Sequence, residues 1–119
     1  MKKILIVEDS ADTTILLSQV VRMALKNAEI KCAATVAEAT PQVSWADLVI
    51  TDYEFPDLGF PALLPLLQKE QRLFILHSAC PDCLKTYEPT LQLGSICKGS
   101  CFTAKILDIL SIVNIRFNS

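Results

Sequence analysis

A surplus of positive charge is missing from this sequence. Eleven lysine and arginine residues face thirteen aspartate and glutamate residues, which gives a formal net charge of −2. Proteins bind the phosphate backbone of nucleic acids through an excess of positive charge, which this chain does not have. We therefore expect no direct binding of nucleic acid. The partners expected instead are proteins or small molecules.

Long hydrophobic runs are missing as well. The apolar run near the start of the sequence ends at residue 7, too early for the core of an export signal. The longest apolar-rich stretch, residues 102–117, is broken by charged and polar residues and is shorter than the roughly 20 residues needed to cross a bilayer. We therefore expect a cytoplasmic protein without a membrane segment.

Internal repeats, linkers and low-complexity tracts are also absent, and 119 residues are enough for one compact domain only. Apolar residues make up 51% of the chain, so a core can form without disulfide bonds. Because the five cysteines are odd in number, free thiols are expected rather than a disulfide scaffold. We expect a single domain over residues 1–119, without an output domain.

Short apolar runs predict the strands. The runs at residues 4–7, 48–50 and 73–76 are continuous rather than alternating, which is typical of parallel strands buried on both faces. The strand that starts at residue 73 is predicted to end at residue 77. Residues 29–34 and 95–98 are predicted as two further strands.

The segments between these strands predict helices. Helical spacing or helix-start signals occur in residues 10–27, 36–43, 61–68 and 102–115, and weaker helical character occurs in residues 84–93. Ser10 and Asp12 are candidate caps for the first helix. Pro65 predicts a late start or a bend in the third. The alternation predicts a doubly wound α/β fold of five parallel strands with helices on both faces.

Polar residues follow the predicted strands. Glu8 and Asp9 follow the first, Asp52 the third, Ser78 the fourth, and Lys98 ends the fifth. In parallel α/β sheets ligands bind beyond the carboxyl ends of the strands, so these side chains should converge. Neighbouring carboxylates need a cation to offset their repulsion, and Mg2+ with oxygen ligands meets that need. The sequence therefore predicts a metal-dependent phosphoryl site.

This ordered set resembles the receiver domains of two-component response regulators, over essentially the whole chain. The first strand ends in the acidic pair Glu8-Asp9, and the third strand ends in Asp52 with Pro56-Asp57 shortly after it. A hydroxyl followed by a small residue, Ser78-Ala79, and the lysine Lys98 complete the match. The resemblance implies a flavodoxin-like fold with the strand order 2-1-3-4-5.

The resemblance also implies a function. Asp52 would be the phosphoacceptor and take a phosphoryl group from a histidine kinase or a phosphotransfer protein. Glu8, Asp9, Asp52 and the backbone carbonyl of Glu54 would hold Mg2+, which neutralises charge during phosphoryl transfer. Signalling would then pass to a downstream protein, with no turnover of a separate substrate.

Three further residues receive roles from the resemblance. Lys98 would pair with Asp52 and then with its phosphoryl oxygens, Ser78 would supply a hydroxyl to the same group, and Ala79 would leave a path to it. Departures from the family pattern include two positions near the lysine. Ser95 stands where an aromatic switch residue is usual, and Gly99 follows the lysine in place of proline.

The last predicted helix is apolar over more than one stripe, which predicts a homodimer or partner interface. The residues are Phe102, Ile106, Leu107, Ile109, Leu110, Ile112, Val113, Ile115 and Phe117. An alternative function is therefore a phosphorylation-independent interaction module of the same fold. A hydrolase with Asp52 as nucleophile is less favoured, because Glu8-Asp9-Ser10 stands where an Asp-x-Asp motif would end the first strand.

The cysteines allow two interpretations. Cys80 with Cys83, and Cys97 with Cys101, flank adjacent strand ends, so four thiols would meet in a zinc or redox site. Alternatively Cys32 and Cys97 are small buried apolar residues, and the others are ordinary loop thiols. The chain has a single histidine, His77, so it cannot form a histidine-rich metal site. We expect His77 to lie partly buried at a strand end.

Overall fold

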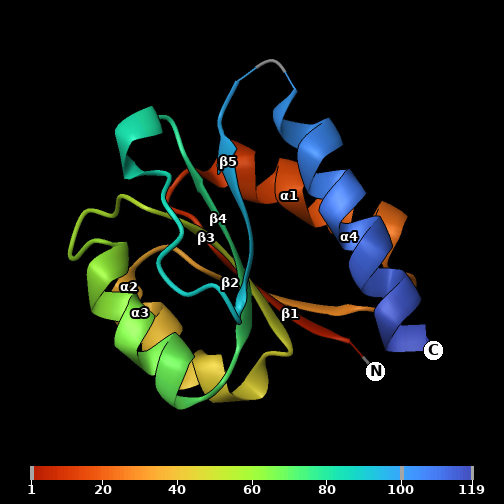
Figure 1. Cartoon of the computed structure of the whole chain (residues 1–119), viewed down its shortest axis with the longest axis horizontal. Coiled ribbons are helices and arrows are strands. Elements are labelled where there is room, and N and C mark those ends of the chain that lie inside the picture. Colours follow the sequence, from red (N-terminus) through yellow and green to blue (C-terminus); the bar gives the residue numbers. More distant parts are fainter. Residues whose placement is uncertain (1, 100, 119) are drawn as a thin grey trace.

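The chain folds into one parallel sheet with helices on both faces; the structure, a computed structural model, describes residues 2–99 and 101–118 (Figure 1). The strands are β1 (Lys3–Val7), β2 (Glu29–Ala33), β3 (Leu48–Asp52), β4 (Leu73–Ser78) and β5 (Gln92–Cys97). The α-helices are α1 (Ala11–Ala24), α2 (Val36–Ala39), α3 (Phe60–Lys69) and α4 (Phe102–Asn118). The sheet order is β2-β1-β3-β4-β5, which confirms the predicted fold class and strand order.

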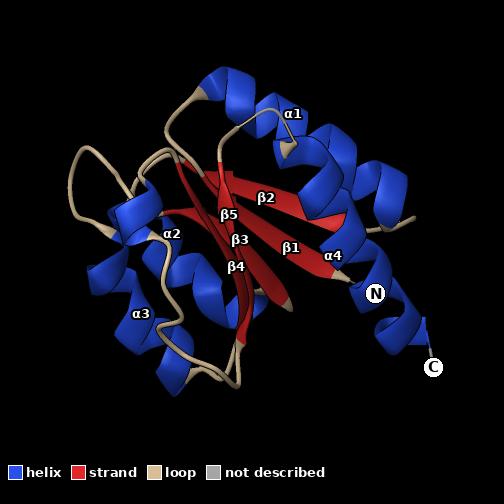
Figure 2. Cartoon of the chain, turned by 45° about the horizontal axis from the view of Figure 1, so that its top comes forward, coloured by secondary structure: helices blue, strands red, loops and turns tan. Residues whose placement is uncertain are grey.

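The central strands β1, β3 and β4 are buried on both faces, which explains the continuous apolar runs. In β1, Leu5 and Val7 pack with the α2 and α3 side of the core, whereas Ile4 and Ile6 pack with the α1 and α4 side. All four side chains are fully buried. Figure 2 shows α2 and α3 over one face and α1 with α4 over the other. A strand covered twice has no solvent-facing positions, so polar alternation is lost.

Helix α1 begins as the sequence predicts and ends earlier. The hydroxyl of Ser10 accepts a hydrogen bond from the backbone N–H of Thr13 at 3.4 Å and so caps the helix. The helix ends at Ala24 rather than at Asn27. Asn27 has a φ of 65°, a left-handed conformation that a right-handed helix cannot include.

Prolines reshape the next two helices. The predicted helix at residues 36–43 is split into the short α2 and the 3₁₀ helix η1 (Thr40–Trp45), because Pro41 has no N–H to continue the α-helical ladder. Helix α3 starts with Pro61 in its first turn and runs through Pro65, so the predicted late start is wrong.

The connection from β4 to β5 differs most from the prediction. Residues 84–93 form no α-helix; a single 3₁₀ turn, η2 (Pro81–Cys83), is followed by irregular chain, and β5 starts at Gln92 rather than at residue 95. The side-chain oxygen of Gln92 accepts hydrogen bonds from the backbone N–H groups of Tyr87, at 2.7 Å, and Glu88, at 3.3 Å. These side-chain bonds satisfy backbone groups that a helix would have paired.

The edge strand β2 corrects another expectation. Cys32 is exposed rather than buried, because it lies on the edge strand β2, which the helices cover only in part. All five cysteines are free thiols. Among residues 2–99 and 101–118, no helix has the length and apolarity needed to cross a membrane.

Helix α4 packs mainly through one apolar stripe. Phe102, Ile106, Leu110 and Val113 are buried against the sheet and α1, whereas Ile112 is 57% exposed. The side chains of Ile115 and Phe117, which the sequence places in the same apolar surface, lie outside the described part of the chain. The structure therefore assigns most of the surplus apolarity to the core.

Candidate functional site

The sheet brings the predicted polar residues to one edge. Asp52 is the last residue of β3 and lies beside His77 of β4. Ser78 ends β4, while Glu8 and Lys98 directly follow β1 and β5. Since all five strands are parallel, these residues meet at the carboxyl ends of the strands, as predicted.

Lys98 joins two buried carboxylates. Its Nζ lies 2.6 Å from Oε1 of Glu8 and 2.7 Å from Oδ2 of Asp52. Glu8 is 3% exposed and Asp52 is 6% exposed. Burial lowers the pKa of Lys98, but its hydrogen bonds and charge interactions with the two carboxylates outweigh burial and raise the pKa above its ordinary value. The ammonium group therefore stays charged and offsets the repulsion between the carboxylates.

Glu8 lies on the inner side of this arrangement. Burial raises the pKa of Glu8, while the hydrogen bonds from Lys98 and from the backbone N–H of Ser10, at 3.0 Å, oppose the rise. Its neighbour Asp9 is exposed and lines the pocket described below. The two acidic residues of the pair thus have different positions: Glu8 is buried and paired with Lys98, and Asp9 is exposed at the pocket.

The second oxygen of Asp52 is held by the backbone. Its Oδ1 accepts hydrogen bonds from the N–H groups of Tyr53, at 2.7 Å, and Glu54, at 3.3 Å. The hydroxyl of Thr51 donates to the Asp52 carbonyl at 2.8 Å. The Asp52 carboxylate is therefore fixed in orientation before any ligand arrives.

A pocket of about 350 Å³ opens over Asp52. Its lining combines carboxylates, a hydroxyl, an ammonium group and a few apolar side chains: Asp9, Asp52, Glu54, Phe55, Pro56, Ser78, Ala79 and Lys98. Every residue predicted for the phosphoryl site except Glu8 therefore lines one cavity. The oxygen-rich donor set fits Mg2+, which prefers carboxylate and carbonyl oxygens and keeps several waters.

Ser78 connects the pocket to the chain that follows it. Its hydroxyl accepts a hydrogen bond from the backbone N–H of Cys80 at 3.0 Å, and Ser78 itself is buried. The next residue, Ala79, is exposed at the pocket wall. A movement of the Ser78 hydroxyl would therefore be transmitted directly to the β4–β5 connection.

His77 is more deeply placed than the sequence predicts. It is fully buried, and neither ring nitrogen has a hydrogen-bond partner among the described residues. Its ring packs against Phe102 with centroids 5.3 Å apart, and one nitrogen belongs to a group with carboxylate oxygens of Glu8 and Asp52, all within 4.8 Å of one another. Burial lowers the pKa of His77 to about 4, so it is neutral at pH 7.

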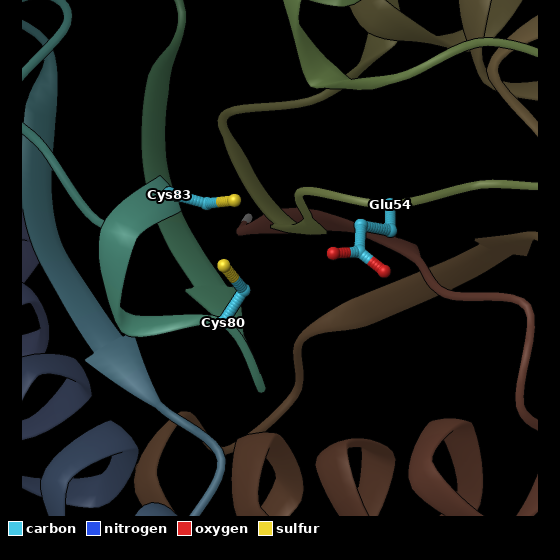
Figure 3. A group of neighbouring side chains, drawn as sticks. All are labelled: Glu54, Cys80 and Cys83. Carbon is cyan, nitrogen blue, oxygen red and sulfur yellow. The ribbon is translucent and has the colours of Figure 1, made fainter.

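A second polar cluster lies beside the pocket. Cys80 and Cys83 approach the side chain of Glu54 (Figure 3). In the part of the chain that the structure describes, neither Cys97 nor Cys101 joins them within ligand distance, so the hypothesis of four converging thiols is wrong. Sequence reasoning missed Glu54 as the third member of this cluster.

Tyr87 is a further residue that sequence reasoning missed. Its ring centroid lies 6.0 Å from that of Tyr53 and 5.4 Å from that of Phe60, and its hydroxyl donates to the Cys83 carbonyl at 2.7 Å. Burial, followed by the Tyr53 hydrogen bond, raises the pKa of Tyr87 to about 12. Ser95, at the usual position of the aromatic switch residue, is exposed on β5.

Asp57, one of the residues that carry the family resemblance, supports the start of α2. Its two carboxylate oxygens accept hydrogen bonds from the backbone N–H groups of Val36 and Ala37 at 3.2 and 3.1 Å. Desolvation opposes ionisation, but these and other backbone hydrogen bonds lower the pKa of Asp57. The β3–α3 loop is thereby tied to the start of α2.

Comparison with solved structures identifies the fold. A receiver domain from Rhodospirillum rubrum has a TM-score of 0.77 and 18% identity, with 95% of this chain and 94% of that chain covered. A receiver domain protein from Methanospirillum hungatei JF-1 has a TM-score of 0.76 and 20% identity, with 99% and 94% covered. The response regulator TrrA from Thermotoga maritima, in complex with Mg(2+)-BeF, has a TM-score of 0.73 and 23% identity, with 92% and 99% covered.

Comparison of the sequence gives no such match. No family model matches the chain, and no curated protein matches its sequence. The likeness is therefore one of fold, and the fold is that of response regulator receiver domains over nearly the whole chain.

Proposed function

We propose that the protein is a phosphoacceptor receiver of a two-component or phosphorelay system. Asp52 receives a phosphoryl group from a histidine kinase or a phosphotransfer protein. The observation that carries this proposal is the Asp52 carboxylate, held by two backbone amides and by Lys98, within an acidic pocket at the carboxyl edge of the sheet. The receiver fold supports the same function.

The chemistry assigns each group a task. An Asp52 oxygen attacks phosphorus, the bond between phosphorus and the donor's histidine nitrogen breaks, and an acyl phosphate forms. Mg2+ held by Asp9, Asp52 and the Glu54 carbonyl would neutralise charge on the transferred group. The sequence predicts Glu8 as a further ligand, but its side chain pairs with Lys98 and does not line the pocket, so Glu8 would contribute its charge from nearby. The complex of the Thermotoga maritima protein with Mg(2+)-BeF supports this assignment. The proposal requires no turnover of a separate substrate.

Phosphorylation would then act as a local charge change. The new group adds about −1.5 to −2 charges at neutral pH, next to an ammonium group shared between Asp52 and Glu8. Lys98 would turn toward the phosphoryl oxygens, and the Ser78 hydroxyl would donate to them. Because that hydroxyl also accepts from the Cys80 N–H, the β4–β5 connection would shift and alter the surface seen by a downstream protein.

A second candidate function is an interaction module that works without phosphorylation. It is favoured by the missing α-helix between β4 and β5 and by an apolar groove between α1 and α4. Met23, which lines this groove, is 71% exposed, and Ile112 of α4 is 57% exposed. The predicted homodimer through the last helix belongs with this candidate.

The chemistry of the cysteines supports a cytoplasmic location for this function. All five are free thiols, and free thiols persist in a reducing compartment.

Phosphorylation of the purified protein by acetyl phosphate tests the proposal. With Mg2+ present, the intact mass should increase by one phosphoryl group, and Asp52→Asn should abolish the increase. Asp82→Asn removes an exposed carboxylate that does not line the pocket and should leave the increase unchanged. A folded protein that shows no adduct and does not bind Mg2+ would contradict the proposal and favour the second candidate.

A further inference from the structure

Two thiols and a carboxylate meet beside the phosphoacceptor pocket. One ligand atom from each of Cys80, Cys83 and Glu54 lies within 4.8 Å of the other two. In Figure 3 the two sulfur atoms lie next to each other, and the Glu54 carboxylate extends toward them from a different loop. A tetrahedral zinc ion places its sulfur and oxygen ligands roughly 3.5–4 Å apart, so small rotations of these side chains would complete the geometry.

Backbone hydrogen bonds hold both cysteines in place. The N–H of Cys83 donates to the Cys80 carbonyl at 3.1 Å within the η2 turn, which presents the two thiols together. The Cys80 N–H is anchored on Ser78, and the Cys83 carbonyl accepts from the Tyr87 hydroxyl. Outer contacts of this kind orient metal ligands and raise affinity.

Carboxylates around the thiols favour a cation. Glu54 places a carboxylate oxygen within 4.8 Å of both sulfur atoms, and Asp82 lies between the two cysteines in the η2 turn. Redox-active CxxC pairs lie instead next to positive groups or at a helix N-terminus, which stabilise a free thiolate. A divalent cation supplies the positive charge that two coordinating thiolates need.

We infer that Cys80, Cys83 and Glu54 form a binding site for a thiophilic divalent cation of the Zn2+ class. On binding, each thiol releases its proton to solvent and forms a metal–sulfur bond, while a carboxylate oxygen and one water complete four-coordination. Sulfur ligands select Zn2+ over Mg2+, which prefers oxygen. The neighbouring pocket and this cluster therefore bind different ions.

Occupancy would connect two walls of the pocket. Glu54 follows β3, and Cys80 and Cys83 lie in the β4–β5 connection, so one ion would fasten these segments together. An effect of the ion on Asp52 phosphorylation rests on the proposed function, whereas the site itself does not.

Titration of reduced, chelator-treated protein with Co2+, in the absence of Mg2+ and phosphodonor, tests the site. Bound Co2+ should show the ultraviolet charge-transfer absorption of cobalt–thiolate bonds at one ion per chain, and Zn2+ should displace it. Cys80→Ser and Cys83→Ser should each lose this absorption. The controls Cys32→Ser and Cys101→Ser change exposed thiols outside the cluster and should keep it.

The remaining ligand is tested by affinity. Glu54→Gln should weaken Co2+ binding by at least about tenfold, because losing a direct ligand costs more than losing an outer hydrogen bond. Asp52→Asn should retain the absorption, which separates this site from the phosphoacceptor pocket. The inference is overturned if no cobalt–thiolate absorption appears, or if the control variants lose as much of this absorption as the Cys80 and Cys83 variants. It is also overturned if Asp52→Asn alone abolishes Co2+ binding.

Discussion

Two polar clusters lie side by side at one edge of the sheet and arise in different ways. The oxygen cluster consists of Glu8, Asp9, Asp52, Ser78 and Lys98, and its members stand at or next to strand ends. The sulfur cluster consists of Cys80, Cys83 and Glu54, and its members stand in the η2 turn or in the loops that follow β3 and β4. Parallel strands bring the first cluster together in any chain of this fold, whereas the second depends on how this chain joins β4 to β5.

The two clusters also differ in how deeply their side chains are buried. In the oxygen cluster two carboxylates are withdrawn from water and must be neutralised by Lys98. In the sulfur cluster Cys80 and Cys83 are only partly buried and Glu54 is exposed. The oxygen cluster should therefore dominate stability, and the sulfur cluster should contribute mainly through a bound ion.

Loss of the bridging ammonium should have the largest effect. Lys98→Met leaves Glu8 and Asp52 buried without a counter-ion, so we expect the free energy of unfolding at pH 7 to fall by about 3–4 kcal/mol. Urea unfolding followed by circular dichroism measures the change. Lys105→Met, at an exposed position of α4, should cost less than about 0.5 kcal/mol. Equal losses in the two variants would contradict the assigned role of Lys98.

The buried His77, which lies beside Glu8 and Asp52 of the oxygen cluster, should make the stability of the protein depend on pH. His77 titrates at about 4 when folded and near 6.5 when unfolded, so the unfolded chain binds more protons between these values. The free energy of unfolding should therefore fall as the pH drops through this window, by up to about 3 kcal/mol at completion.

Comparison with His77→Leu isolates that effect. Glu8 titrates with the opposite sign, because its pKa is raised on folding, but it does so in both proteins. We expect the variant to lose less stability than the wild type between pH 7 and pH 4 in urea unfolding. A wild type and a variant with parallel pH profiles would show that His77 is not held neutral.

The smallest effect is expected at the sulfur cluster. Tyr87→Phe removes the hydrogen bond to the Cys83 carbonyl, so the free energy of unfolding should fall by about 1 kcal/mol and Co2+ affinity by up to about tenfold. Phosphoryl incorporation at Asp52 should stay unchanged. If incorporation falls and Co2+ affinity does not, Tyr87 serves the oxygen cluster and the comparison between the clusters fails.

The sequence was sufficient to predict the fold and the oxygen cluster for a physical reason. Strands buried on both faces must be continuously apolar, as in β1, and the residues that follow parallel strands must meet at one edge. Asp52 and Lys98 lie far apart in sequence and β4 separates their strands, yet both stand at the carboxyl edge of the sheet, where the long lysine side chain reaches the carboxylate.

The β4–β5 connection could not be predicted in the same way. Leu84, Tyr87 and Leu91 have helical spacing, and the structure instead packs them as irregular chain against the core. Packing against the core and the hydrogen bonds of the Gln92 side chain stabilise this irregular conformation in preference to a helix. Glu54 was missed for a related reason, since its approach to the thiols depends on two loops whose paths no local pattern determines.

The position of the phosphoryl group tests the central claim most directly. After reaction with acetyl phosphate and Mg2+, borohydride reduces an aspartyl phosphate to homoserine, and peptide mass analysis locates the modified residue. We predict a single modification at Asp52 that requires Mg2+. Modification at another residue, or none in folded protein that binds Mg2+, would contradict the account.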